Sequence, residues 1–367
     1  MGDASRIGIV GVGVISGAYL KTLIVRPDVR VTAIADLNMD RAAEVAAGIP
    51  GARALAVPEL LADPEVDVVL NLTIPAAHAD IALAAIANGK HVYGEKPLAV
   101  DFESGRRVTD AATAAGVRVG CAPDTVLGTG TQTARVVIGE GRIGRPLAAT
   151  AVWGSAGHES WHPNPDFYYL PGGGPLMDMG PYYISALVHL LGPVTAVVAS
   201  ASRLRNDRVI GRGPRAGERI PAEVDTHVSG ILEHANGALS TLTTSFDTVR
   251  SGAAPIEVHG ETGSLSVPDP NMFSGDVSLF ARGSKEWEPV ADRAGYVDAA
   301  RGIGLLDMLA APTDTDVRTS GRLALHALEV MTALIESAHT GARVVLSTTV
   351  QRPPLVPLGQ EFDLREL

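Results

Sequence analysis

Short apolar runs alternate with amphipathic stretches along the first third of the chain. The pattern predicts strands at 7–10, 29–35, 66–72, 91–94 and 117–121. Between these runs, apolar residues recur at helical spacing over 16–25, 39–47, 77–87 and 102–115. Strands and helices that alternate at this spacing indicate a parallel sheet with crossover helices, wound on both faces.

The pattern changes after Pro123, where strand-like runs follow one another with few helices between them. These runs lie at 147–153, 194–201, 224–233, 238–245, 256–259 and 264–267. Helices are expected at 129–138 and 318–339, and an exposed Arg- and Gly-rich loop at 203–219. A succession of strands without crossover helices predicts a large, mostly antiparallel sheet. We therefore expect an α/β chain with a doubly wound domain at 1–122 and a second α/β domain at 123–367.

Composition narrows the class of protein. The chain has 367 residues, of which 46% are hydrophobic and 19% charged, as in ordinary globular proteins. Its net charge of −11 argues against nucleic acid or an anionic membrane as the main partner. The one cysteine, Cys121, excludes an internal disulfide and an all-cysteine metal cluster. The sequence contains neither a signal-peptide pattern nor an apolar run of about 18 residues, so we expect a cytoplasmic protein.

A glycine motif, Gly11-Val12-Gly13-Val14-Ile15-Ser16, follows the first expected strand and opens a helix. Gly11 permits the tight turn, and Gly13 lets the backbone approach a pyrophosphate. The helix start at Val14 and Ile15 supplies N–H groups and a positive dipole. Glycine-rich turns after strands are common, so the motif predicts a Rossmann dinucleotide-binding domain only in combination with further residues.

Asp36 is the first of these further residues. It ends the second expected strand, 20 residues after Ser16, where a carboxylate binds the ribose 2′-hydroxyl of an adenosine. The same carboxylate repels a 2′-phosphate, so the cofactor is expected to be NAD. Arg41 leaves NADP open, because an arginine can hold the additional phosphate. The alternative role for Asp36 is the N-cap of the next helix.

The Glu95-Lys96-Pro97 segment follows the strand at 91–94, where ligands of doubly wound sheets bind. The chain contains only 4 lysines against 26 arginines, so a lysine here is not a general choice of cation. Lysine can release its proton when partly buried, whereas arginine cannot. Lys96 is therefore a candidate for proton transfer, and a structural ion pair with Glu95 is the alternative.

These features, taken in order, resemble the glucose–fructose oxidoreductase / inositol dehydrogenase (Gfo/Idh/MocA) family over essentially the whole chain. The matching segments are Gly11-Val12-Gly13, Asp36, Asn71-Leu72-Thr73-Ile74-Pro75 with His78, Gly89-Lys90-His91-Val92 before Glu95-Lys96-Pro97, and Gly172-Gly173-Gly174-Pro175-Leu176-Met177-Asp178. The resemblance implies NAD(P)-dependent hydride transfer at a secondary carbinol or ketone of a sugar or cyclic polyol. It also implies cofactor contacts from Thr73, Pro75, His78, Glu95 and Lys96.

The resemblance assigns Asp178 to the substrate and catalytic network. Many family members carry a histidine four positions later, but Tyr182 stands here, as in branches such as glucose–fructose oxidoreductase itself. On a helix these two residues share one face. We therefore expect Lys96 and Tyr182 to relay a proton to or from the substrate oxygen.

Seven of the 16 aromatic residues lie between Trp153 and Tyr183, and aromatic rings stack on the apolar faces of sugars. Within this window, His158-Glu159-Ser160-Trp161-His162 imitates the metalloprotease motif His-Glu-x-x-His. Pro163 disfavours the helix that this motif requires, so no metal site is expected. We expect a substrate-facing loop in which Trp161 and His162 contact the sugar, or else a structural loop at a subunit contact.

Because the open face of an antiparallel sheet needs a cover, we expect a homodimer or homotetramer. Three other functions stay open at this point: an NAD-dependent glycosidase of the same family, a non-catalytic dinucleotide-binding regulator, and a metalloprotease. The sequence does not identify the sugar, the reacting carbon or the physiological direction.

Overall fold

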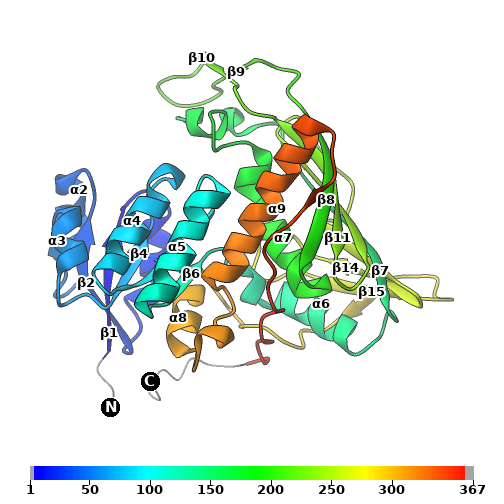
Figure 1. Cartoon of the computed structure of the whole chain (residues 1–367), viewed down its shortest axis with the longest axis horizontal. Coiled ribbons are helices and arrows are strands. Elements are labelled where there is room, and N and C mark those ends of the chain that lie inside the picture. The colour runs from blue at the N-terminus through cyan, green and yellow to red at the C-terminus, as the bar shows by residue number, and fades with distance from the viewer. Residues whose placement is uncertain (1–3, 360–367) are drawn as a thin grey trace. The chain divides into compact units, whose positions relative to one another are not determined.

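The computed structural model describes residues 4–359. Within this range the chain forms two compact units, one of residues 4–127 and 298–325, the other of 128–297 and 326–359 (Figure 1). The expected boundary near residue 122 lies close to the first change of unit. The segment 298–325, which the sequence placed in the second domain, returns to the first unit.

The contacts of Asp124 explain why the segment 298–325 belongs to the first unit. Its carboxylate is fully buried and accepts hydrogen bonds from the N–H groups of Gly302 at 2.8 Å and Gly304 at 3.3 Å. Arg301 adds an ion pair at 3.3 Å. Burial raises the pKa of the Asp124 carboxyl, and these partners oppose that shift. A single buried carboxylate thus joins the end of the sheet region to a segment far along the chain.

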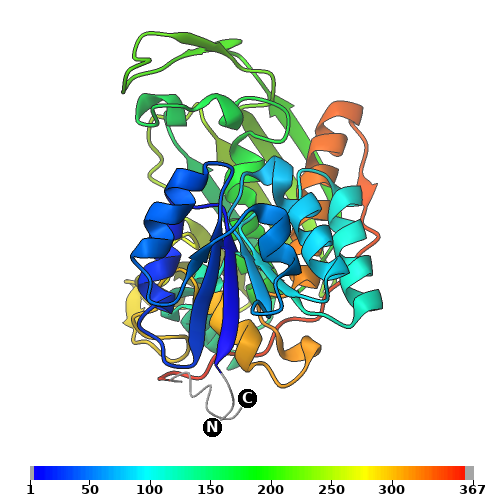
Figure 2. The same cartoon turned by 90° about the vertical axis from the view of Figure 1, so that its left-hand side faces the viewer.

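The first unit contains a six-stranded parallel sheet in the order β3-β2-β1-β4-β5-β6, which confirms the expected doubly wound sheet. Figure 2 shows helices to either side of its strands. The strands are β1 Ser5–Val10, β2 Val29–Ala35, β3 Arg53–Ala54, β4 Val68–Asn71, β5 His91–Gly94 and β6 Val119–Cys121. Strand β3 was not expected, since two residues give no readable periodicity.

The first unit contains six α-helices and two 3-10 helices among its described residues. They are α1 Ser16–Leu23, α2 Met39–Ala47, α3 Val57–Ala62, α4 Pro75–Ala87, α5 Phe102–Ala115 and α8 Ile303–Ala310, with the 3-10 helices η1 Thr125–Leu127 and η4 Asp314–Asp316. The Asp101 side chain caps α5, which ends at Gly116 in the left-handed conformation. Helix α8 was missed because it is almost entirely apolar and buried, and so shows no polar face.

The second unit contains a nine-stranded sheet in the order β16-β15-β14-β13-β7-β12-β11-β8-β17. Its strands are β7 Pro146–Gly154, β8 Val194–Ser202, β11 His227–His234, β12 Leu239–Ser245, β13 Ile256–Gly260, β14 Gly263–Val267, β15 Val277–Ala281, β16 Glu288–Val290 and β17 Val344–Val345. Only β7 and β12 pair in parallel, which confirms the expected mostly antiparallel sheet. The last three strands are short and were not expected.

Two long helices pack against this sheet. The helices here are α6 Thr129–Gly139, α7 Pro175–Leu191 and α9 Gly321–Thr340, of which α9 belongs to this unit from residue 326, with η2 His158–Ser160 and η3 Asp166–Tyr168. A side chain at Gly180 of α7 would lie 2.8 Å from the sulfur of Met331, so the two helices approach closely. Ser337 of α9 accepts a hydrogen bond from the N–H of Ala199 in β8 at 2.9 Å.

The segment expected as an exposed loop at 203–219 contains a small two-stranded sheet, β9 Asp207–Val209 and β10 Arg219–Pro221. Its Arg208 is only 2% exposed, which corrects the expectation for this residue. The guanidinium lies 2.9 Å from Asp247 and over the ring of Tyr169 at 5.1 Å. Among the described residues, no helix has the length and apolar character needed to cross a membrane.

Candidate active site

Glycine stands at positions 11 and 13 for different structural reasons. Gly11 adopts a φ of +92°, and a Cβ there would lie 2.8 Å from the main-chain carbonyl of Leu72. The fold itself therefore requires glycine at position 11. A Cβ at Gly13 would meet nothing within 4 Å. Because the protein's own packing leaves position 13 open, its glycine suits the close approach of a pyrophosphate.

The turn that follows presents main-chain donors at the start of α1. The hydroxyl of Ser16 donates to the carbonyl of Gly13 at 2.7 Å and closes the turn. Within residues 4–359, the N–H groups of Val14 and Ile15 have no main-chain acceptor, and the Val14 side chain is fully exposed. Such donors at a helix N-terminus favour an anionic ligand.

Asp36 joins this turn to the second strand. Its Oδ2 accepts the N–H of Val12 and its Oδ1 accepts the N–H of Asn38, both at 2.8 Å. The alternative role as helix cap is wrong, since Asn38 caps α2 by accepting the N–H of Arg41 at 3.1 Å. The carboxylate is thus fixed beside the glycine loop, where a ribose hydroxyl would reach it. Leu37 is 99% exposed directly after it and offers an apolar surface for an adenine.

The turn after β4 holds three of the expected cofactor residues. Thr73 donates from its hydroxyl to Oδ1 of Asn71 at 2.7 Å, and Pro75 is the first residue of α4. His78 is 3% exposed, with Nδ1 2.7 Å from the carbonyl oxygen of Pro97 and Nε2 3.0 Å from that of Thr73. This imidazole therefore connects the turn after β4 to the segment that carries Lys96.

Lys96 follows β5 on a segment fixed from several sides. Oε1 of Glu95 accepts the hydroxyl of Tyr19 at 2.8 Å, and its Oε2 accepts the N–H of Lys96 at 3.1 Å. The N–H of Glu95 donates to the carbonyl of Asn71 at 2.9 Å. Burial and the Glu95 charge raise the pKa of the Tyr19 phenol, which keeps it a neutral donor. Sequence reasoning missed Tyr19, because no motif marks a residue in this role.

Asp178 and Tyr182 lie one turn apart in α7, which confirms that a helix carries both. Asp178 stands in the first turn, where the helix dipole favours a carboxylate. Its Oδ2 lies 2.8 Å from Nε2 of His158. Tyr182 is 6% exposed. Sequence reasoning missed His158 as the partner of Asp178, because the His-Glu-x-x-His pattern directed attention to metals.

An aromatic cluster surrounds His158. Its ring centroid lies between 4.4 and 5.9 Å from those of four neighbours: Trp153, Trp161, Tyr168 and Phe246. Trp161 is 51% exposed and lies 5.4 Å from the ring of His162. Partial burial lowers the pKa of His162. The two expected substrate contacts thus lie in the loop that also supplies the partner of Asp178.

The loop at 158–162 does not form the helix that the His-Glu-x-x-His motif of zinc proteases requires. Residues His158–Ser160 form a single 3-10 turn, and Glu159 turns away toward Tyr169 and Arg208. Within the described part of the chain, no group of three or more His, Cys, Asp or Glu residues could hold a metal ion.

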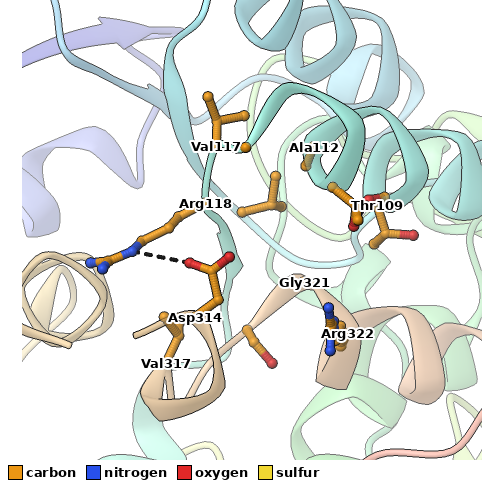
Figure 3. A pocket seen from close by; sticks show the side chains of 12 residues that line it. Thr109, Ala112, Val117, Arg118, Asp314, Val317, Gly321 and Arg322 are labelled. Carbon is orange, nitrogen blue, oxygen red and sulfur yellow. Dashed lines mark hydrogen bonds and ion pairs between the residues drawn. The ribbon is translucent and has the colours of Figure 1, made fainter. Parts of the chain in front are cut away.

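A pocket in the first unit lies away from the predicted residues. It is lined by the end of α5, the start of β6 and the segment around η4, and Arg118 contacts Asp314 there at 3.2 Å (Figure 3). None of the predicted cofactor or substrate residues lines it. The predicted site residues fall into two sets, one around Lys96 in the first unit and one around Asp178 and Tyr182 in the second.

Comparisons with known proteins identify the two domains. Residues 5–122 match the oxidoreductase family with an NAD-binding Rossmann fold, and residues 131–266 match the GFO/IDH/MocA C-terminal domain. A 1,5-anhydro-D-fructose reductase from Ensifer adhaerens is 31% identical over 269 residues, which cover 71% of this chain and 75% of that protein. An inositol 2-dehydrogenase from Pseudomonas fluorescens is 36% identical over 152 residues, 39% of this chain and 44% of that protein.

Solved structures share the fold. An NAD binding oxidoreductase from Klebsiella pneumoniae superposes with a TM-score of 0.81 at 24% identity, covering 94% of this chain and 100% of that one. A levoglucosan dehydrogenase in complex with NADH and L-sorbose gives a TM-score of 0.76 at 22% identity, covering 94% and 99%. Together with the two matched domains, the comparisons establish the family. The chain is a member of the GFO/IDH/MocA family of NAD-binding oxidoreductases.

Proposed function

We propose that the protein is an NAD-dependent oxidoreductase that interconverts a secondary alcohol and a ketone on a sugar or cyclic polyol. The observation that carries this proposal is the face of α7, where Asp178 and Tyr182 lie one turn apart beside an aromatic cluster. Aromatic rings bind the apolar faces of sugar rings, and the polar pair supplies directed hydrogen bonds. Relatives named for an anhydrofructose and for inositol support this substrate class.

The first unit would hold the dinucleotide. The open space at Gly13, the donors at Val14 and Ile15 and the carboxylate of Asp36 fit a pyrophosphate and a ribose. When bound, the nicotinamide supplies the acceptor or donor of a hydride. We assign Thr73, Pro75, His78, Glu95 and Lys96 to its surroundings, with His78 and Glu95 acting through the segments that they hold. Asp36 favours NAD over NADP by charge.

Lys96 and Tyr182 carry out the proton transfer. In the oxidation direction, the Tyr182 hydroxyl accepts the proton of the substrate hydroxyl and passes it to the Lys96 amine; reduction reverses this path. Asp178 orients the substrate hydroxyl. Trp161 and His162 contact the sugar ring from the loop at 158–162, since half of the Trp161 side chain is exposed there.

The open face of the nine-stranded sheet supports a homodimer or homotetramer. Three apolar side chains of β8, β11 and β12 are exposed on this face: Val198 at 39%, Ile231 at 44% and Leu239 at 50%. Clustered exposed apolar residues are typical of an interface. Analytical ultracentrifugation tests this part, with Ile231→Glu expected to shift the assembly toward smaller species.

The function is tested by incubating the purified protein with a panel of sugars and polyols and either NAD or NADP. We expect net formation of reduced cofactor with at least one of these substrates, and higher kcat/KM with NAD. Cleavage of a glycoside without net cofactor reduction would instead favour the glycosidase reading. Failure to bind either dinucleotide would contradict the proposal.

A further inference from the structure

We infer that His158 is a positioning residue of the active site, which holds the Asp178 carboxylate through Nε2–H while its Nδ1 accepts the indole N–H of Trp161. The inference deepens the proposed function and rests on it. It also gives the His-Glu-x-x-His segment a role that involves no metal.

The tautomer follows from three atoms. The indole Nε1–H of Trp161 lies 3.3 Å from Nδ1 of His158, and an indole nitrogen can only donate. Nδ1 therefore carries the lone pair. In the neutral ring the proton is then on Nε2, which lies 2.8 Å from Oδ2 of Asp178 and donates to it. The carboxylate acceptor on Asp178 and the indole donor on Trp161 therefore agree on one neutral tautomer of His158.

The His158 ring has little freedom to leave this position. Its side chain is only 9% exposed, and the rings of Tyr168 and Phe246 lie 4.4 and 4.7 Å from it between centroids. Burying a polar ring among aromatic side chains costs free energy unless both nitrogens find partners, and here both do. A packed aromatic cluster that contains a directed polar pair favours one orientation of the imidazole.

Glu159, the residue after His158, anchors the same loop to a second set of partners. Glu159 is 5% exposed, accepts the hydroxyl of Tyr169, and lies 3.4 Å from the buried guanidinium of Arg208. Its carbonyl accepts the N–H of Gly211 at 2.7 Å. The two motif residues therefore point to different partners, His158 to the catalytic carboxylate and Glu159 to the small sheet of β9 and β10.

The consequence for the reaction concerns the geometry of α7. A hydrogen bond from His158 fixes the rotamer of Asp178 one helical turn before Tyr182. A carboxylate that must orient a substrate hydroxyl loses effectiveness when its rotamer is free. His158 does not itself touch the substrate in this account; it acts through Asp178.

The test uses variants that separate the loss of the N–H donor from a change in side-chain volume. His158→Phe keeps an aromatic ring and removes the N–H donor, whereas His158→Gln restores an N–H near Nε2. We expect His158→Phe to lower kcat by about 10-fold or more, with the Kd of NADH unchanged, and His158→Gln to recover most of this loss. The matched control is His259→Phe, because His259 bonds Ser264 in the β13–β14 hairpin.

A double-mutant cycle with Asp178→Asn distinguishes positioning from general structural damage. If His158 acts through Asp178, adding His158→Phe to Asp178→Asn costs less than about 2-fold in kcat, whereas independent roles multiply. Thermal unfolding of every variant checks that the unit stays folded. NMR of heavy-nitrogen-labelled histidine gives a readout without turnover: we expect a protonated Nε2 and an unprotonated Nδ1 on His158.

The outcomes separate the two proposals. Wild-type turnover with an unchanged kcat in His158→Phe, multiplicative losses in the cycle, or a proton on Nδ1 would each overturn the positioning role and leave the proposed function standing. Wild-type protein that binds NADH but turns over no sugar or polyol would overturn the proposed function, and the positioning role with it.

Discussion

The hydroxyl of Tyr19 donates a 2.8 Å hydrogen bond to Oε1 of Glu95, the residue before Lys96. Tyr19 lies in α1, the helix that begins directly after the glycine loop. The bond therefore joins the helix that would receive the pyrophosphate to the segment that carries the proposed proton-transfer lysine. Both features occupy the carboxyl ends of β1 and β5, where doubly wound sheets bind their ligands.

This connection predicts the effect of Tyr19→Phe. The change preserves the ring but leaves the Glu95 carboxylate without its buried donor, so the free energy of unfolding should fall by about 1–3 kcal/mol. Because Glu95 also accepts the N–H of Lys96, kcat should fall more than the affinity for NADH. Chemical denaturation and steady-state kinetics measure both effects.

Tyr93→Phe is the matched control in the same unit. The Tyr93 side chain is fully buried, and its hydroxyl interacts with Thr319, whereas the Tyr19 hydroxyl bonds Glu95. Equal losses of kcat in the two variants would contradict a specific role for the bond between Tyr19 and Glu95.

Alanine variants of Gly11 and Gly13 should have different effects on stability and on cofactor binding. Gly13→Ala should unfold at the wild-type temperature without cofactor and should lose most of the stabilisation by NADH, since only a ligand would meet the new methyl group. Gly11→Ala should lower the free energy of unfolding by about 2 kcal/mol or more without any ligand, because of its positive φ and the contact with Leu72. Thermal unfolding with and without NADH measures both.

The opposite pattern, with Gly13→Ala unstable and Gly11→Ala tolerated, would contradict the assignment of position 13 to cofactor binding. Normal stabilisation of Gly13→Ala by NADH would do the same.

Neighbouring tyrosines in α7 test the proton relay. Tyr182→Phe should lower kcat by at least about 100-fold with NADH binding intact, because a general acid–base contributes about 10²–10⁴-fold. Tyr183→Phe serves as the control, since the Tyr183 hydroxyl is 3.3 Å from Asp269 and burial raises its pKa, which keeps it protonated. Rapid-mixing kinetics separates chemistry from cofactor release. A Tyr182→Phe enzyme with full turnover would remove Tyr182 from the mechanism.

His326 predicts a pH dependence of stability. Burial lowers its pKa to about 4, and its Nε2 accepts the N–H of Val194 at 3.1 Å, which requires a neutral ring. The unfolded chain binds this proton near pH 6.5, so the contribution to stability is complete above that value and is lost as pH falls toward 4. The loss amounts to about 3 kcal/mol for a pKa shift of this size.

Denaturation of the wild type and of His326→Gln at several pH values isolates this group from the carboxylates that titrate nearby. The difference in unfolding free energy between the two proteins should shrink between pH 7 and pH 4. A difference that is constant over this range would show that His326 does not titrate as described.

Local rules predicted the parallel sheet, most helix boundaries and the glycine loop, because each depends on residues close in the chain. Strand β2 and helices α2 and α5 occur at their predicted residues, with Asn38 and Asp101 as caps. Helix α8 was not predictable in this way, since it is almost entirely apolar and its N-terminal end is held by Asp124, a residue far away in the sequence.

In the candidate site too, single residues were predictable from local sequence, whereas their partners were not. Motif and resemblance identified Lys96, Asp178 and Tyr182 as individual residues. Their partners come from distant segments: Tyr19 reaches Glu95 across 76 positions, and His158 reaches Asp178 across 20. Side-chain pairing across separate elements leaves no periodic trace in a sequence, so the structure was needed to find these contacts.

Transfer of deuterium is the most direct test of the central claim, that this chain oxidises a sugar or polyol carbinol with NAD. A substrate from the reactive panel is deuterated at its secondary carbinol carbon, and the reduced cofactor is analysed by mass spectrometry. The account predicts one deuterium in the cofactor for each ketone formed. Ketone formation without deuterium in the cofactor, or no ketone from any sugar or polyol in protein that binds NAD, would contradict it.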